Sequence, residues 1–192
     1  MFKIMVAVLL ATAGTATAAS PTDTVKAAVE QVFSQPGGSA VKPVSTAERR
    51  AEIRKVTERL FDFDEMSQRS LGSAWAKATP AEQKEFVRLF GGLIANAYLS
   101  RIEQYTGEPI TYVGERVEGD EARVQSNVLT PKGSEVAIEY RLYRSTEDRW
   151  TVYDIYVEGI SLVGSYKAQF NRILQRGSFA DLLKQLRQKT GS

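Results

Sequence analysis

The sequence of 192 residues contains neither cysteine nor histidine. Without cysteine the chain has no disulfide framework, no thiol nucleophile and no cysteine-based zinc site. Without histidine it lacks the side chain that most often acts as acid or base near neutral pH and most often binds metal ions. Serine–histidine hydrolases, cysteine–histidine hydrolases and most zinc enzymes are therefore excluded. The formal net charge of +2 is too small to indicate nucleic-acid binding.

Phosphate-binding glycine motifs are missing too, because the sequence has neither a P-loop nor a dinucleotide fingerprint. What the chain does contain is an ordinary globular composition, with 43% apolar and 25% charged residues. That composition excludes wholesale disorder, and the length predicts one domain.

The first residues are typical of a secretory signal peptide. Lys3 gives a short positive region, Ile4 to Leu10 are apolar, and Ala16-Thr17-Ala18 matches an A-x-A cleavage signal. The segment turns to small and polar residues too soon for the roughly 20 apolar residues of a membrane anchor. We predict a signal peptide over residues 1–18, with cleavage after Ala19 as the alternative, and a single exported domain over residues 19–192.

Apolar residues recur at helical spacing in the first part of the domain and again at its end. Three starts are marked by capping signals: Ser45 with Glu48, Thr79-Pro80 with Glu82, and Ser178 with Asp181. Asp64 is a candidate cap for a short helix that stops at Gly72, and the stretch from Pro36 to Pro43 resembles a linker. The predicted helices cover residues 25–33, 46–60, 64–71, 80–106, 165–176 and 178–189.

Between these helices the hydrophobic period changes from 3.6 to 2, which predicts strands. The predicted strands are residues 109–117, 121–129, 135–143 and 149–157. Their connections are so short that neighbouring strands must be antiparallel. The fourth strand has large residues on both faces, so we expect it to be central and covered on both sides. The pattern predicts an α+β fold in which amphipathic helices wrap a curved antiparallel four-stranded sheet around an apolar cavity.

Carboxylates are the main candidates for chemistry in a chain without histidine. Asp154 lies in an apolar strand, where it is either a general base with a raised pKa or a structural acceptor of hydrogen bonds. Asp62, Asp64 and Glu65 suggest a metal site, but helix capping explains them equally well and no calcium-loop pattern surrounds them. The basic helix face from Arg49 to Arg59 is either a solvated surface or a contact for lipid headgroups or an acidic partner.

Two separated motifs stand out in the sequence. The first runs from Phe61-Asp62-Phe63 through Ser67 to Thr79-Pro80 and Phe90. The second runs from Trp150 to Asp154 and continues from Glu158-Gly159 to Phe170. Together they resemble the MlaC family of periplasmic phospholipid-binding proteins. The resemblance extends from about Val25 to Leu186 and includes Tyr98, Arg101 and Ile102.

The resemblance implies a nuclear-transport-factor-like cone with extra helices, and a deep cavity that takes phospholipid acyl tails. It also implies a soluble carrier, expected to be a monomer without cofactor or catalytic activity, that maintains the lipid asymmetry of the outer membrane. The implied partners are an inner-membrane ABC transporter with a ring-shaped lipid-binding subunit and an outer-membrane lipoprotein working with a porin.

Periodicity indicates which apolar residues could line such a cavity, although the same pattern fits a solid core. The predicted lipid-binding residues are Phe63, Met66, Leu93, Ile94, Tyr98, Val124, Ile138, Tyr140, Leu142, Val152, Val163, Tyr166 and Phe170. One rival hypothesis is an enzyme on the same fold that uses Asp154 with Tyr153 or Tyr140 on a small hydrophobic substrate. Another is an adaptor with a solid core that binds no lipid.

Overall fold

The computed structural model describes residues 19–33, 46–103 and 107–191, with the side chains of 46 and 98–103 excepted. The predicted signal peptide and the linker-like stretch lie outside these ranges. The described residues form helices α1 (Pro21–Phe33), α2 (Thr46–Leu60), α3 (Phe63–Leu71), η1 (Gly72–Lys77), α4 (Pro80–Glu103), α5 (Leu162–Leu174) and α6 (Phe179–Thr190), and strands β1 (Ile110–Glu118), β2 (Glu121–Leu129), β3 (Glu135–Arg144), β4 (Trp150–Val157) and β5 (Ile160–Ser161).

Local capping explains where several helices begin. Before α4, the backbone N–H and hydroxyl of Thr79 both donate to Glu82 at 2.8 Å, and the Glu82 N–H donates back to the Thr79 hydroxyl. Ser178 and Asp181 form the same reciprocal box at the start of α6. Each arrangement satisfies N–H groups that the first helical turn leaves without partners. The predicted caps at Thr79 and Ser178 are therefore confirmed, whereas α3 is capped by Asp62 and not, as predicted, by Asp64.

The strands form one antiparallel sheet in the order β1-β2-β3-β4-β5. Tight turns join them, and Gly119 and Gly133 supply the positive φ angles that two of these turns need. The four predicted strands are confirmed to within one residue at each end. Our expectation that β4 is central is wrong, because only the two-residue β5 lies beyond it.

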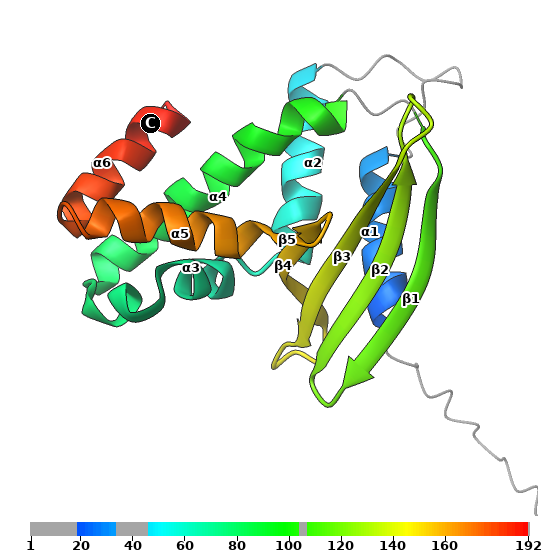
Figure 1. Ribbon diagram of the computed structural model, residues 1–192, viewed down its shortest axis with the longest axis horizontal. Helices are drawn as coiled ribbons and strands as arrows, with labels where there is room; N and C mark the ends of the chain where they lie inside the picture. The colour runs from blue at the N-terminus through cyan, green and yellow to red at the C-terminus, as the bar shows by residue number, and fades with distance from the viewer. Residues whose placement is uncertain (1–18, 34–45, 104–106, 192) are drawn as a thin grey trace, which may run out of the picture.

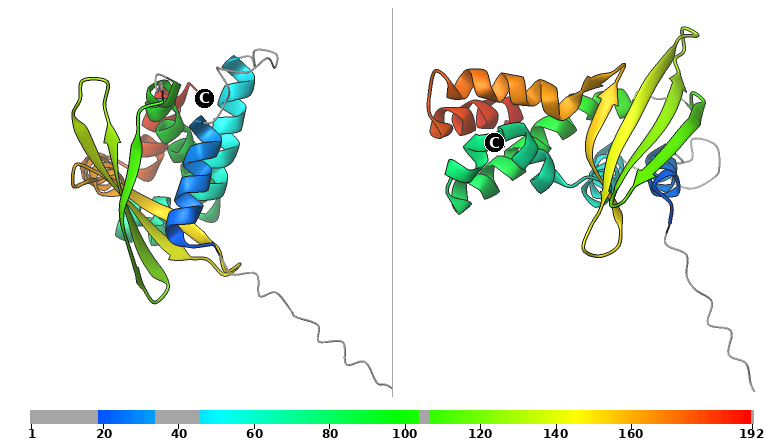
Figure 2. Two further views of the ribbon diagram at one scale, coloured as in Figure 1. Left: turned by 90° about the vertical axis from the view of Figure 1, so that its right-hand side faces the viewer. Right: turned by 60° about the horizontal axis from the view of Figure 1, so that its bottom comes forward.

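Two groups of helices flank the sheet. Helices α1 and α2 run along one face of it, which we call the inner face (Figures 1 and 2). Helices α3, α4, α5 and α6 gather beside the β4 edge as a separate bundle (Figure 1). The helices therefore wrap the sheet less evenly than the pattern predicts, since most of them pack on one another.

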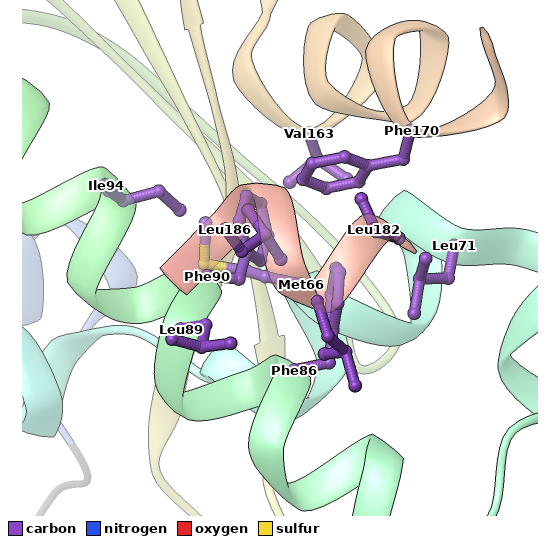
Figure 3. Packing of buried hydrophobic residues seen from close by; sticks show 11 residues of the cluster. Met66, Leu71, Phe86, Leu89, Phe90, Ile94, Val163, Phe170, Leu182 and Leu186 are labelled. Atoms are coloured by element: carbon purple, nitrogen blue, oxygen red, sulfur yellow. The ribbon is translucent and has the colours of Figure 1, made fainter. Parts of the chain in front are cut away.

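The buried apolar side chains divide into two clusters that follow this arrangement. The bundle cluster contains Met66, Leu71, Phe86, Leu89, Phe90, Ile94, Val163, Phe170, Leu182, Leu183 and Leu186. Side chains from all four bundle helices point toward one another in it (Figure 3). The sheet cluster contains Val25, Leu60, Ala122, Val124, Tyr140, Leu142, Trp150 and Val152. Phe61, which directly follows α2, packs against both clusters.

Aromatic contacts hold the bundle cluster together. The ring of Phe170 meets those of Phe86 and Phe90 edge-on, with centroids 5.3 Å apart in both pairs. Tyr166 meets Phe90 in the same way at 5.1 Å. Each such pair adds about 0.5–1.5 kcal/mol beyond the burial of its surface. The bundle is therefore a packed core.

Candidate functional site

The two sequence motifs that carried the family resemblance meet in space where the chain passes from the sheet to the bundle. Phe61 forms a parallel bridge with Val152 of β4, and the backbone N–H of Asp62 donates to the Val152 carbonyl at 2.9 Å. The Asp62 carboxylate accepts from the Glu65 N–H at 2.8 Å and from the hydroxyl of Tyr143 on β3. One side chain therefore caps α3 and ties it to the sheet.

The hydrogen bond to Asp62 changes the ionisation of Tyr143. Because the carboxylate accepts from the protonated phenol, it raises the pKa of Tyr143 to about 12. A guanidinium contact lies close by: Arg69 of α3 sits 4.0 Å from the ring centroid of Tyr153 and forms an ion pair with Glu65 at 2.7 Å. Polar contacts thus connect α3 to the sheet.

Asp154 connects β4 to the bundle in a similar way. Its side chain is 6% exposed, and its two carboxylate oxygens accept from the backbone N–H groups of Ile155 and Val163 and from the hydroxyl of Ser161. Ser161 in turn caps α5 by accepting from the Gly164 N–H at 2.7 Å. A carboxylate at a helix N-terminus is stabilised by the helix dipole. This geometry supports the structural interpretation of Asp154 over the general-base interpretation.

The carboxylates of the first motif do not gather as ligands. Asp62 is occupied by its cap and by Tyr143, while Asp64 lies in the first turn of α3. Within residues 19–33, 46–103 and 107–191, no three acidic side chains come close enough to hold a metal ion.

The burial of apolar residues on the inner face of the sheet differs between its two ends. At the end near the β3–β4 turn, Ala122, Val124, Leu142, Trp150 and Val152 are buried under α1 and α2. We call this end the closed half. Towards the β2–β3 turn, cross-strand pairs place a further set of apolar residues on the same face. This open half consists of Ile110, Val128, Val136, Ile138, Ile155 and Val157.

The open half keeps its apolar surface only partly covered. Val157 is 38% exposed, and the other members of the open half are half-buried. Tyr140 lies where the two halves meet, and burial raises the pKa of its hydroxyl while the neighbouring Ser126 hydroxyl opposes that shift. A largely apolar surface that leads from a sealed core to a partly open end can accept a long apolar ligand.

A depression on the opposite, outer face of the sheet is a weaker candidate. It has a volume of about 280 Å³, and Val113, Gln125, Asn127, Glu139 and Tyr156 contribute to its lining. Its floor carries polar groups already paired with one another, such as Gln125 with Glu139 and Glu139 with Arg141. Because pockets for drug-sized ligands already occupy roughly 300–1,000 Å³, the depression is too small for a lipid with two acyl chains.

The predicted lining residues are divided between the two clusters. Seven belong to the bundle cluster or pack against it: Phe63, Met66, Leu93, Ile94, Val163, Tyr166 and Phe170. Five belong to the sheet cluster or pack against it: Val124, Ile138, Tyr140, Leu142 and Val152. The side chain of Tyr98 lies outside the described residues. Of the twelve described residues, Ile138 is a member of the open half.

Most of the open half was not predicted from the sequence. Val128 and Val136 alternate with polar residues in β2 and β3, so their orientation was readable, but nothing in the pattern distinguished them from residues of the sealed core. Phe61 was noted as part of a motif, and its position between the two clusters required the structure.

No helix among the described residues combines the length and the apolar character needed to cross a membrane.

Among known proteins, one resembles this chain in fold and another in sequence. A solved phospholipid-binding protein from Ralstonia solanacearum, in complex with a phospholipid, matches with a TM-score of 0.77 and 26% identity, covering 90% of this chain and 98% of that one. The intermembrane phospholipid transport system binding protein MlaC of Haemophilus influenzae is 28% identical over 123 residues. That alignment covers 62% of this chain and 57% of the relative, so the match spans little more than half of the relative's length.

A family model also matches most of the chain. The model for the MlaC protein aligns with residues 25–188, which include both clusters, the junction at Phe61 and the Asp154 cap. This coverage of most of the chain, together with the likeness in fold, shows that the protein belongs to the MlaC family.

Proposed function

We propose that this protein is a periplasmic phospholipid carrier that holds acyl tails against the inner face of its sheet. The observation that carries the proposal is the likeness over 90% of the chain to a protein solved with a bound phospholipid. The partly covered apolar residues of the open half support the same reading, because they offer a surface that a soluble protein otherwise buries.

The energetics of acyl tails explain why a carrier needs such a surface. Each buried methylene contributes about 0.8 kcal/mol, so a tail of roughly 16 carbons gains more than about 10 kcal/mol on leaving water. A carrier must match much of that gain and must release the tail without covalent chemistry. Apolar side chains meet both demands, and neither histidine nor cysteine is required.

The proposed lining combines the open half with part of the original set. Ile138 is its centre, Tyr140 and Val152 continue it toward the closed half, and Phe63 and Leu93 are half-buried at the edge of the bundle cluster. The fully buried residues Met66, Val163 and Phe170 act as packing that supports the wall.

Native mass spectrometry of protein made with its own leader in a Gram-negative host tests lipid binding. We expect the purified protein to carry glycerophospholipid that dissociates on collisional activation. Protein that emerges without lipid, and does not take up phospholipid from vesicles, would overturn the proposal and favour the solid-core adaptor.

A charge on the lining separates a binding surface from an ordinary core. Ile138→Arg should abolish phospholipid co-purification because a guanidinium among acyl tails is costly, while the half-buried site lets the fold persist. Ala137→Arg is the matched control, because Ala137 is the adjacent, exposed residue on the outer face. Circular dichroism checks folding. Lipid retained in folded Ile138→Arg protein contradicts the proposed site.

The carrier is proposed to act between two membrane complexes and so to maintain outer-membrane lipid asymmetry. Its proposed partners are an inner-membrane ABC transporter with a ring-shaped lipid-binding subunit and an outer-membrane lipoprotein with a porin. Transfer of labelled phospholipid from donor to acceptor vesicles, accelerated by wild-type protein and not by Ile138→Arg, tests the shuttle. Wild-type protein that binds lipid but leaves the transfer rate unchanged would overturn this part.

A further inference from the structure

Helix α2 carries one arginine, Arg49, on the same side as its buried apolar residues. Ile53, Val56 and Leu60 lie on its inner side, with 4%, 2% and 8% of their surface exposed. Arg49 precedes Ile53 by four residues and therefore continues the same stripe. The other cations of this helix, Arg50, Arg54, Lys55 and Arg59, are exposed, whereas Arg49 is half-buried.

The Nε atom of the Arg49 guanidinium is buried and, within the described part of the chain, has no hydrogen-bond partner. Arginine stays charged at every physiological pH, so the group cannot escape this situation by losing a proton. A buried donor without an acceptor is destabilising, and more so when it is charged. A cation held in this way can accommodate an anionic ligand.

The position of Arg49 relates it to the proposed lipid site. Leu60, at the far end of α2, packs in the sheet cluster beside Val152 and Trp150 of the closed half. Arg49 lies about 16 Å earlier along the helix axis, from the rise of 1.5 Å per residue. Helix α2 begins at the end of the molecule where the β2–β3 turn lies (Figure 1). Its first turn, which contains Arg49, therefore lies toward the same end as the open half.

We infer that Arg49 binds the phosphate group of the lipid headgroup at the rim of the inner face, an inference that rests on the proposed function. Acyl tails lie along the open half, and the phosphate meets the guanidinium at its end. Arginine suits this role because its planar fork donates two parallel hydrogen bonds to a phosphate. The first turn of α2 adds a favourable dipole for an anion. The contact recognises phosphate and leaves the remainder of the headgroup free.

Two short-chain lipids with the same tails test this assignment by calorimetry on delipidated protein. Wild-type protein should bind dioctanoyl phosphatidylglycerol about ten- to a hundred-fold more tightly than dioctanoylglycerol, which lacks the phosphate. Arg49→Ala should bind both lipids equally, at the dioctanoylglycerol level. Arg49→Lys should fall between, since it keeps the charge and loses the fork. Arg54→Ala, an exposed cation on the same helix, should bind as wild type does.

The stability of the lipid-free Arg49→Ala variant is a second measurement. If Arg49 served only the fold, its replacement would lower this stability. Without lipid, Arg49→Ala should unfold at the same or a higher urea concentration than wild type, because the variant removes a half-buried charge. A variant that is destabilised and loses affinity for both lipids alike would show that Arg49 serves the fold, and it would overturn the inference.

The remaining outcomes separate the inference from the proposed function. Unchanged phosphatidylglycerol affinity in Arg49→Ala overturns the headgroup assignment alone. Wild-type protein that binds neither lipid overturns the proposed function and the inference with it. Titration with inorganic phosphate covers the other source of the anion. Phosphate binding that Arg49→Ala abolishes without changing lipid affinity would make this a site for free phosphate and overturn the assignment to the headgroup.

Discussion

At the scale of single residues, two carboxylates connect the sheet to the bundle. Asp62 caps α3 while it accepts from Tyr143 of β3, and Asp154 of β4 holds the start of α5 through Ser161 and Val163. Asp62 therefore joins α3 to β3, and Asp154 joins β4 to α5. The sequence identifies both as acidic residues in unusual places. Tyr143 is 81 residues from Asp62, and the contacts of Asp154 with Ser161 and Val163 require the turn between β4 and α5, so these partners appear only in the folded structure.

Replacing Asp154 should therefore affect stability and leave lipid binding in the folded protein intact. Asp154→Ala strands the Val163 N–H and the Ser161 hydroxyl, so we expect the free energy of unfolding to fall by roughly 2–4 kcal/mol. Asp154→Asn keeps one acceptor oxygen and should lose less. Urea denaturation measures the change, and native mass spectrometry measures the lipid. A fully stable Asp154→Ala protein would mean that the carboxylate does not anchor α5.

Tyr143 should make the stability depend on pH in the alkaline range. The bond to Asp62 raises its pKa from the ordinary value of 10 to about 12 in the folded protein. Between these values the unfolded chain has lost the proton and the folded protein still holds it, so stability falls as pH rises. Below pH 10 the contribution is fully present.

Tyr143→Phe lacks this proton and provides the comparison. Its urea midpoint should fall less than that of wild type between pH 10 and about pH 12. Burial also raises the pKa of Tyr140 and Tyr153, but both residues remain in the variant, so their effects cancel in the difference. Identical pH profiles for the two proteins would rule out the Tyr143–Asp62 bond as the cause.

At the scale of helices and strands, local signals predicted most of the fold. The strands follow strict alternation, and the boxes at Thr79 and Ser178 depend only on residues three positions apart, so both were readable. Helix α5 begins at Leu162, earlier than predicted, because its cap is Ser161 supported by Asp154 from a strand. Because Asp154 lies on the preceding strand, outside the three- or four-residue spacing of a capping box, it leaves no capping signal at the helix start.

The candidate site was less predictable for a related reason. Periodicity shows that Phe90 and Val124 face inward, but it does not show that they face different interiors. The division into a bundle cluster and a sheet cluster arises from how whole helices are placed. Likewise, the sequence marks Arg49 as one of several cations on α2, and only its burial separates it from Arg54.

At the scale of the whole molecule, the aromatic side chain of Phe61 lies between two cores, and one of the two tryptophans is associated with each core. Trp75 packs against the bundle cluster, and Trp150 belongs to the sheet cluster. Phe61 contacts both clusters, and the bonds of Asp62 and Asp154 cross between the same regions. We therefore expect the two cores of the wild-type protein to unfold together.

In Phe61→Ala protein, the bundle core and the sheet core should unfold in two separate transitions. We expect a loss of about 2–3 kcal/mol, below the roughly 3–5 kcal/mol typical of a fully buried phenylalanine because Phe61 is half-buried. Tryptophan fluorescence of Trp75→Phe and Trp150→Phe backgrounds reports each core separately. Phe179→Ala is the control, since Phe179 packs against the bundle cluster only and should shift both reporters together. Coincident transitions in Phe61→Ala protein would argue against its role as the joint.

The order of the elements along the chain has a consequence for how the molecule is made. Half of the bundle, α3 and α4, is synthesised before the sheet, and its other half, α5 and α6, comes after it. Part of the apolar stripe of α4 therefore stays exposed until Leu182 and Leu186 of α6 have been synthesised and can pack against it. The bundle can form completely only after α6 has been translated. A truncation that removes α6 would therefore remove side chains from the interior of the bundle.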